Sequence, residues 1–331
     1  MTGNRTLTFG VFVPQGWRLD LPRELPPADQ WRALVEVATK IEKLGFDGAW
    51  VYDHLHTFPI REPRTVFEPW TTLNALATLT KTVRLGQLVT CYAYRIPGIL
   101  AKLSSCLDVI SGGRLEFGIG AGWYEEEFNA FGIPYEKASV RIAQLAEAIQ
   151  IVKRMWTEEE TTFRGKYYNV ERALNYPKPI QKPHPPVTLG GGGEKLTLRL
   201  VAEHADKWNV DTPYTVDDCR RKLKILETYC KEIGRQFDQM EISVHRDVIV
   251  DRERGNVDRM LKERHRTLYS WLAYQSFLDR HLRGTPSECI EQMRKFVDVG
   301  VSHFVMYVPN SLEIAPLELI AEEVVPGVVR K

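Results

Sequence analysis

The sequence is poor in cysteine and has no excess of charge of either sign. Its 331 residues include five scattered cysteines without a CxxC pair, so we expect no disulfide framework, and the thiols suit a reducing cytoplasm. The 44 basic and 43 acidic side chains leave a formal net charge of +1, which excludes a global field for holding nucleic acid or an anionic membrane. No apolar run approaches the roughly 20 residues that span a bilayer. We therefore expect a cytoplasmic protein whose partner is a small molecule.

What the sequence does contain is a repeated alternation of amphipathic helix, glycine-containing turn and apolar, β-rich run. Such runs lie near residues 9, 50, 86, 117, 188, 209, 245 and 305. Eight is the number of strands, alternating with helices, that closes a parallel barrel. The sequence therefore predicts an α/β fold of the (β/α)8 TIM-barrel class, formed by residues 1–331 as a single domain. A doubly wound open sheet is the alternative, because periodicity cannot show whether the last strand pairs with the first.

Two stretches interrupt the alternation and are predicted insertions in the βα loops. Residues 157–185 contain four prolines and several aromatic residues, which favours an ordered, lid-like excursion on the barrel over a domain linker. Residues 251–284 form the second insertion. Its charged first part, 251–266, is typical of a solvated helix, and we assign it no chemistry.

Asp53 and His54 follow the second strand, at the end of the barrel where active sites form. A histidine titrates near neutrality, and a carboxylate beside it can orient the ring or hydrogen-bond a cofactor, so His54 is the candidate catalytic residue. The alternative is a ring that fills a polar gap at the rim. With His56 the pair also resembles the HxH of amidohydrolase metal sites. Later strand ends offer glycines, Asn209 and Tyr307 in place of further histidines and an aspartate, so we expect no metal.

Two glycine-rich turns follow later strands. The run from Gly190 through Gly191 and Gly192 to Gly193 precedes a helix, so its bare backbone and the helix N-terminus suit a phosphate; a tight turn is the alternative. The segment 118–122 is not a dinucleotide fingerprint, because Trp123 stands where the third glycine belongs. We expect it instead to let a flat ring lie close to the backbone. The candidate ring contacts are Gly120, Ala121 and Gly122.

Four segments together resemble the luciferase-like superfamily of flavin and deazaflavin oxidoreductases. They are GAWVYDH, RLGQLVT, SGGRLEFGIGAGW and VTLGGGGEKLTLRLVAEHAD. The resemblance runs from about Leu7 to Val210, and GTPSECIEQMRKFVDVGVSHFVMY resembles the last helix and strand of that family. It is closest to the branch that uses the deazaflavin coenzyme F420.

The resemblance implies where coenzyme and substrate bind. In the family a nonprolyl cis peptide after the third strand lies against the ring. The matching bond here is Leu88-Val89 or a neighbour, which makes candidate cofactor contacts of Leu88, Val89 and Thr90. The resemblance also implies that Asp53 touches the deazaflavin ring and that His54 meets the substrate. It further implies that the 191–193 loop holds the phosphate of the coenzyme tail, and that the protein is a homodimer.

The sequence departs from the F420-dependent sugar-phosphate dehydrogenases at two positions of the substrate pocket. Trp123 stands where they have a catalytic glutamate, and Phe58 replaces a tryptophan, so glucose 6-phosphate is not the expected substrate. Because Trp123 replaces that glutamate, we expect the second acid/base group, besides His54, to be Glu126 or another carboxylate. The expected pocket residues are Gln15, Phe58, Trp123 and Glu126.

The residues and the resemblance together predict an F420-dependent oxidoreductase. It would transfer a hydride between C5 of the deazaflavin and a small organic substrate, an alcohol or carbonyl or an activated double bond, with His54 relaying the proton. One alternative is a reduced-FMN-dependent monooxygenase of the same superfamily. The other is a noncatalytic flavin-binding barrel that stores or senses a cofactor.

Overall fold

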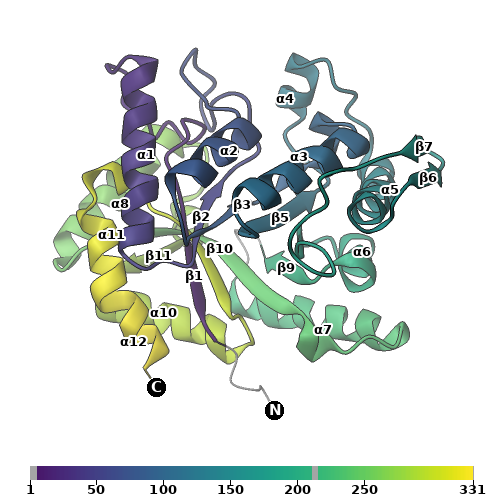
Figure 1. Cartoon of the computed structure of the whole chain (residues 1–331). Helices are drawn as coiled ribbons and strands as arrows, with labels where there is room; N and C mark the ends of the chain where they lie inside the picture. The colour runs from purple at the N-terminus through teal and green to yellow at the C-terminus, as the bar shows by residue number, and fades with distance from the viewer. Residues whose placement is uncertain (1–5, 211–214, 331) are drawn as a thin grey trace.

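The computed structural model describes residues 6–210 and 215–330 and contains a closed parallel barrel (Figure 1). Its eight strands are β1 (Thr8–Phe12), β2 (Gly48–Val51), β3 (Arg84–Gln87), β5 (Leu115–Gly120), β8 (Val187–Gly190), β9 (Lys207–Val210), β10 (Glu241–Val250) and β12 (His303–Tyr307). The barrel closes where β12 pairs in parallel with β1, Thr8 opposite His303. The predicted barrel is therefore confirmed, and the open-sheet alternative is wrong.

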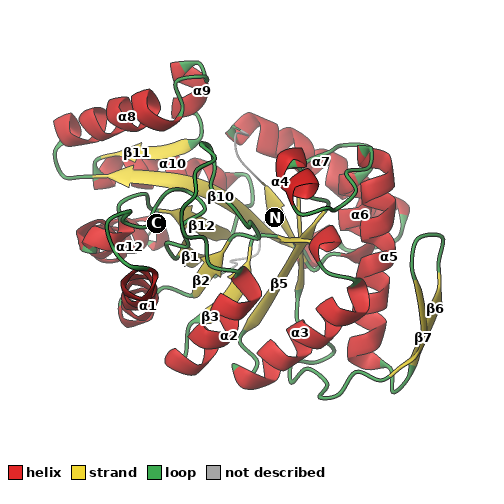
Figure 2. Ribbon diagram, turned by 90° about the horizontal axis from the view of Figure 1, so that it is seen from above, coloured by secondary structure: helices red, strands yellow, loops and turns green. Residues whose placement is uncertain are grey.

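Helices surround the strands, as Figure 2 shows. Those that follow barrel strands are α1 (Pro27–Lys43), α2 (Pro69–Leu79), α3 (Pro97–Ile110), α4 (Glu125–Ala130), α5 (Ala138–Thr157), α6 (Thr197–His204), α7 (Val216–Glu232) and α10 (Pro286–Asp298). Short helical segments are η1 (Tyr92–Tyr94), η2 (Phe237–Gln239), η3 (Ser311–Glu313), α11 (Ala315–Leu319), η4 (Ile320–Val324) and α12 (Val325–Val329). Among the described residues, no helix is long and apolar enough to cross a membrane.

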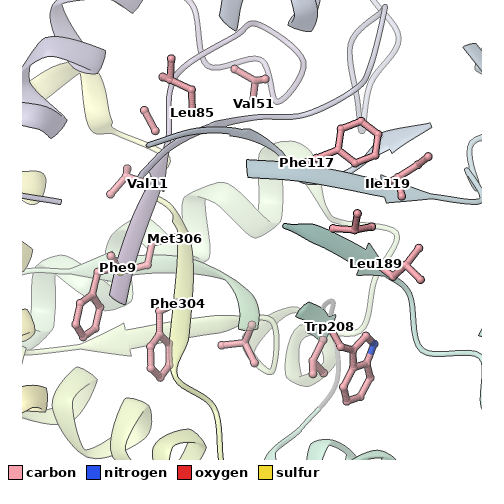
Figure 3. Close-up of a cluster of buried hydrophobic side chains, with 14 of the residues drawn as sticks. Phe9, Val11, Val51, Leu85, Phe117, Ile119, Leu189, Trp208, Phe304 and Met306 are labelled. Carbon is pink, nitrogen blue, oxygen red and sulfur yellow. The ribbon is translucent and has the colours of Figure 1, made fainter. Parts of the chain in front are cut away.

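The strands bury apolar side chains on both faces. Alternate residues such as Phe9 and Val11 of β1, and Phe304 and Met306 of β12, point outward into the layer beneath the helices (Figure 3). The opposite face fills the barrel with Trp50, whose indole lies against three glycines. A Cβ at Gly10 would lie 2.2 Å from Trp50 Nε1, and one at Gly86 would lie 2.4 Å from Trp50 Cζ3. Glycine is therefore required at these positions to accommodate a tryptophan inside the barrel.

The first predicted insertion is a two-stranded antiparallel hairpin beside α5, seen at the edge of Figure 2. Its strands are β6 (Thr161–Arg164) and β7 (Asn169–Ala173). The Glu147 carboxylate of α5 fixes it by accepting hydrogen bonds from the backbone N–H groups of Lys166, Tyr167 and Tyr168. The hairpin packs on the outer helix and contributes no residue to the cavity described below, so it does not act as a lid.

The second predicted insertion, by contrast, lies at the barrel mouth. It contains α8 (Arg254–Leu268), α9 (Tyr274–Leu278) and β11 (His281–Gly284), which extends the sheet beside the end of β10. A further short strand, β4 (Thr90–Cys91), pairs with β5. These additions build the C-terminal end of the barrel, where parallel α/β barrels carry their active sites.

A buried charge cluster occupies the other end of the barrel. Lys207 Nζ lies 3.0 Å from a Glu116 oxygen and 3.2 Å from a Glu241 oxygen, and His303 Nδ1 lies 3.3 Å from the same Glu241 oxygen. Burial alone would raise the pKa of Glu241, but the contacts with His303 and Lys207 lower it to about 2. Such a depressed pKa means that the ionised form stabilises the fold above the unfolded pKa, and that this contribution is lost as the pH falls toward 2.

We predict that Glu241→Gln lowers the free energy of unfolding at pH 7 by roughly 1–3 kcal/mol, discounted because 32% of the side chain remains exposed. The difference from wild type should shrink between about pH 5 and pH 2, because the Glu241 carboxylate of the unfolded wild-type chain takes up a proton in that range while the folded one stays ionised down to about pH 2. Urea unfolding of the variant and the wild type at pH 7 and between pH 5 and pH 2 measures the loss and its dependence on pH. Glu171→Gln, at an exposed position of β7, is the control and should behave as wild type. A loss of stability for Glu241→Gln that does not change with pH would contradict the lowered pKa of Glu241 in the folded protein.

Candidate active site

A cavity of about 620 Å³ opens at the C-terminal mouth of the barrel, a volume typical of small-molecule sites. Its wall brings together most of the residues predicted from the sequence, although they come from distant parts of the chain. The predicted residues that line it are Asp53, His54, Phe58, Leu88, Val89, Gly120, Ala121, Gly122, Trp123, Gly190, Gly191 and Gly193.

Four predicted residues lie outside this wall. Gln15 is buried, and its side chain joins two backbone segments: it donates to the Phe67 carbonyl at 2.6 Å and accepts from the Tyr52 N–H at 3.0 Å. Thr90 donates to the Gln87 side chain at 2.6 Å. These two side chains support the mouth of the barrel from behind the cavity.

The other two lie near the cavity but face away from it. Gly192 turns its carbonyl to Lys222 Nζ, 2.5 Å away. Glu126 is exposed and pairs with Arg61 at 3.0 Å. The carboxylate that reaches the site is its neighbour, Glu127.

His54 is held on two sides. Its Nδ1 lies 2.8 Å from Glu127 Oε2, and its ring stacks on Trp17 with centroids 4.0 Å apart and planes 8° apart. Only 12% of the His54 side chain is exposed, on the side of the cavity. Our sequence analysis did not single out Glu127, because three consecutive glutamates look like a helix start favoured by the helix dipole. The adjacent apolar Phe128, which is also buried, was the available signal that this turn faces inward.

Asp53 is completely enclosed and is bound by protein groups on both carboxylate oxygens. Its Oδ2 accepts from the Cys91 N–H at 2.7 Å and from Arg95 Nη1 at 2.8 Å, and its Oδ1 accepts from Arg95 Nη2 at 3.0 Å. Burial raises the pKa of Asp53, and the Arg95 guanidinium opposes that rise without cancelling it. Arg95 also pairs with Glu68 at 2.5 Å. The sequence analysis missed Arg95, which carries no motif.

The predicted nonprolyl cis peptide is present between Leu88 and Val89. The Val89 side chain lies against two glycines at neighbouring strand ends. A Cβ at Gly120 would lie 2.7 Å from Val89 Cγ2, and one at Gly190 would lie 3.0 Å from it. Glycine at these two positions therefore lets the cis peptide and the Val89 side chain, together called the Val89 bulge, project into the cavity between β5 and β8.

A polar network forms the far wall, beneath the second insertion. Arg18 Nη2 donates to Asp247 at 2.6 Å and to the Tyr269 hydroxyl at 2.9 Å. The Tyr52 hydroxyl lies 3.0 Å from His245 Nε2. Burial would raise the pKa of Asp247, but the nearby Arg18 and histidines hold it well below its usual range. Burial lowers the pKa of His281 to about 4, so this ring is neutral at pH 7.

The chain is similar along nearly its full length to proteins whose names state a coenzyme and an activity. It is 27% identical to an F420-dependent glucose-6-phosphate dehydrogenase from Intrasporangium calvum, with 94% of this chain and 98% of that protein aligned. The fold matches a solved F420-dependent secondary alcohol dehydrogenase in complex with an F420-acetone adduct (TM-score 0.81, 20% identity, 98% and 99% of the chains). It also matches the oxygenating constituent of 3,6-diketocamphane monooxygenase from Pseudomonas putida, solved with FMN (TM-score 0.76, 16% identity, 97% and 98%).

The family model that matches this chain is described as luciferase-like monooxygenase. It covers residues 7–303, which include the first seven barrel strands, the first residue of β12 and every residue of the cavity wall. The chain therefore belongs to the luciferase-like monooxygenase family.

Proposed function

We propose that this protein is an F420-dependent oxidoreductase that moves a hydride between the deazaflavin and a small organic substrate, with His54 relaying a proton. The observation that carries the proposal is that His54 lines the same cavity as the Val89 bulge and the glycine loop. The full-length similarity to F420-dependent dehydrogenases supports the choice of coenzyme. This cofactor, when bound, supplies a hydride donor or acceptor at C5.

The residues of the cavity fit such a coenzyme. Gly120 and Gly190 make room for the Val89 side chain, and the three residues together form a cradle whose apolar surface can support a planar ring. Gly191, Gly193 and Thr197 line the wall at the start of α6, where backbone N–H groups suit a phosphate. The residues of this chain then bind the coenzyme and the substrate and orient them toward each other. Such orientation can lower the activation barrier by several kcal/mol.

We predict that Gly120→Ala damages this cradle. Its Cβ would meet Val89 Cγ2 and should cost about 1–3 kcal/mol of stability by overpacking, with a clear loss of coenzyme affinity because the bulge must move. Thermal unfolding and fluorescence titration measure the two effects. Adding Val89→Ala should relieve the clash. The double variant should therefore lose less stability than the sum of the losses of the two single variants. Gly255→Ala, with nothing within 4 Å of its Cβ, is the matched control and should keep wild-type affinity.

Aromatic side chains support a substrate with an apolar body. Trp17, Phe58 and Trp123 surround His54, and the ring of Phe58 meets that of Trp123 edge-on at 5.4 Å. A substrate bound against this wall would displace water from the space before His54. Trp123 and Phe58 are the departures that argue against glucose 6-phosphate, although relatives carry that activity in their names. We therefore propose an alcohol or carbonyl, or an activated double bond.

The alternative is a reduced-FMN-dependent monooxygenase, because the barrel is shared with an enzyme solved with FMN. Parallel titrations of the purified protein with F420 and with FMN separate the two functions. We expect tight binding of F420 and little binding of FMN; the reverse result would refute the proposal. Turnover is then screened with alcohols, carbonyls and enones. Binding of F420 without turnover of any of them would favour the noncatalytic barrel.

We further propose that the protein acts in the cytoplasm as a homodimer. All five cysteines are free, which suits a reducing compartment. Leu79 at the end of α2 and Ile99 near the start of α3 leave about half of their side chains exposed on helices that pack together, and Ile96, which precedes α3, is 67% exposed. Sedimentation equilibrium should give twice the mass of one chain. A monomer at micromolar concentration would contradict this assembly.

A further inference from the structure

Glu127 is a buried carboxylate that accepts four hydrogen bonds. Its Oε1 accepts from the N–H groups of Leu55 at 2.6 Å and His56 at 3.2 Å, and its Oε2 contacts the Tyr94 hydroxyl and His54 Nδ1. Burial alone would raise the pKa of Glu127, but the bonds from His54, the Leu55 N–H and Tyr94 outweigh burial and lower it. A carboxylate surrounded in this way is ionised and has no hydrogen to donate.

The state of Glu127 decides which nitrogen of His54 carries the hydrogen. Because the carboxylate can only accept, the hydrogen of the His54 to Glu127 bond must sit on Nδ1. In a neutral imidazole the other nitrogen then has a lone pair, and here that nitrogen is Nε2. Within the described parts of the chain no protein group hydrogen-bonds to Nε2, and the stacked Trp17 fixes the plane of the ring.

We propose that Glu127 is a positioning residue that holds His54 in the Nδ1–H tautomer, so that Nε2 is the base that faces the substrate. Its catalytic consequence rests on the proposed function. In the oxidation of an alcohol, Nε2 would accept the hydroxyl proton, and bound F420 would supply the acceptor for the hydride from the same carbon, which becomes a carbonyl. Glu127 stabilises the resulting imidazolium from the opposite side of the ring.

Glu127→Gln separates this role from a structural one. The amide oxygen can still accept from the Leu55 and His56 N–H groups, which preserves the link between α4 and the loop after β2. The amide nitrogen, however, donates to His54 Nδ1 and forces the hydrogen onto Nε2. Glu126→Gln is the matched control, because it makes the same chemical change one residue away at an exposed position.

The tautomer is measured directly in the coenzyme-free protein. Long-range proton–nitrogen spectra of 15N-histidine-labelled protein, with the His54 signals identified by their loss in His54→Ala, distinguish the two ring forms when the ring is neutral. We expect Nδ1–H in the wild type and in Glu126→Gln, and Nε2–H in Glu127→Gln. The same tautomer in wild type and Glu127→Gln would overturn the proposal.

Turnover supplies the second readout. With F420 and an alcohol substrate, Glu127→Gln should lower kcat on the order of 10²-fold or more, with the coenzyme Kd unchanged. An inverted tautomer with unchanged kcat would overturn the positioning role. Absence of turnover by the wild type with every substrate would instead refute the proposed function, while the tautomer result would still decide how Glu127 acts on His54.

Discussion

His54→Ala is expected to lower kcat by about 10²- to 10⁴-fold, the range that a general acid/base contributes, while the Kd for F420 changes only a few-fold. Both expectations follow from position. The imidazole lies between Trp17 and Glu127 on the side of the cavity, whereas the groups that suit the coenzyme are the Val89 bulge and the glycine loop. Stopped-flow reduction of F420 by an alcohol, with equilibrium titration of F420, measures the two quantities separately.

The variant also allows a chemical rescue. Removing the imidazole leaves a space beside Trp17, so added imidazole should restore part of the lost rate, and the restored rate should saturate with its concentration. His56→Ala is the control, because His56 lies two residues away, contacts Phe131 and does not line the cavity. Equal turnover by His54→Ala and wild type would remove His54 from the mechanism.

The barrel could be predicted from the sequence because its signals are local. Each strand is a short apolar run, and glycine turns such as Gly45 and Gly300 end the helices before them with positive φ angles. The cis peptide at Leu88-Val89 has no local signal of this kind. It was predicted only because the segment resembles a family, and the structure confirms it.

The partners of the site residues could not be predicted in this way. Glu127 reaches His54 across 73 positions, and Arg95 reaches Asp53 across 42, so each contact depends on how the barrel closes. Among three consecutive glutamates, periodicity does not tell which one faces inward. The second insertion gave a similar difficulty. Its charged helix α8 is not the fully solvated helix that was predicted, because the Arg264 guanidinium lies over the rings of Tyr269 and Tyr307. Beyond that helix, Tyr269 and Arg280 line the cavity.

Arg95→Met should be the most destabilising substitution at the site, with an expected loss of about 3–5 kcal/mol at pH 7 to 8. The reason is the asymmetry of buried ion pairs: removing one partner leaves the other charge buried and unpaired. Asp53 would keep only the Cys91 N–H as a hydrogen-bond donor, while the second partner of Arg95, Glu68, is 39% exposed and can be solvated. Urea unfolding of wild type and variant measures the loss.

The loss should also depend on pH, in a direction that identifies its cause. Burial already raises the pKa of Asp53 with Arg95 present, and without the guanidinium only the weaker effects of the Cys91 N–H and His54 oppose that rise. The folded variant then binds a proton more readily than the unfolded chain, so its stability increases as the pH falls, and the deficit should narrow between pH 8 and pH 5. Replacing Asp53 by Asn in the same chain removes the titrating group and should recover most of the stability at pH 8. A deficit that is constant with pH, or that Asp53→Asn leaves in place, would mean that Arg95 stabilises the mouth of the barrel by packing and not by neutralising Asp53.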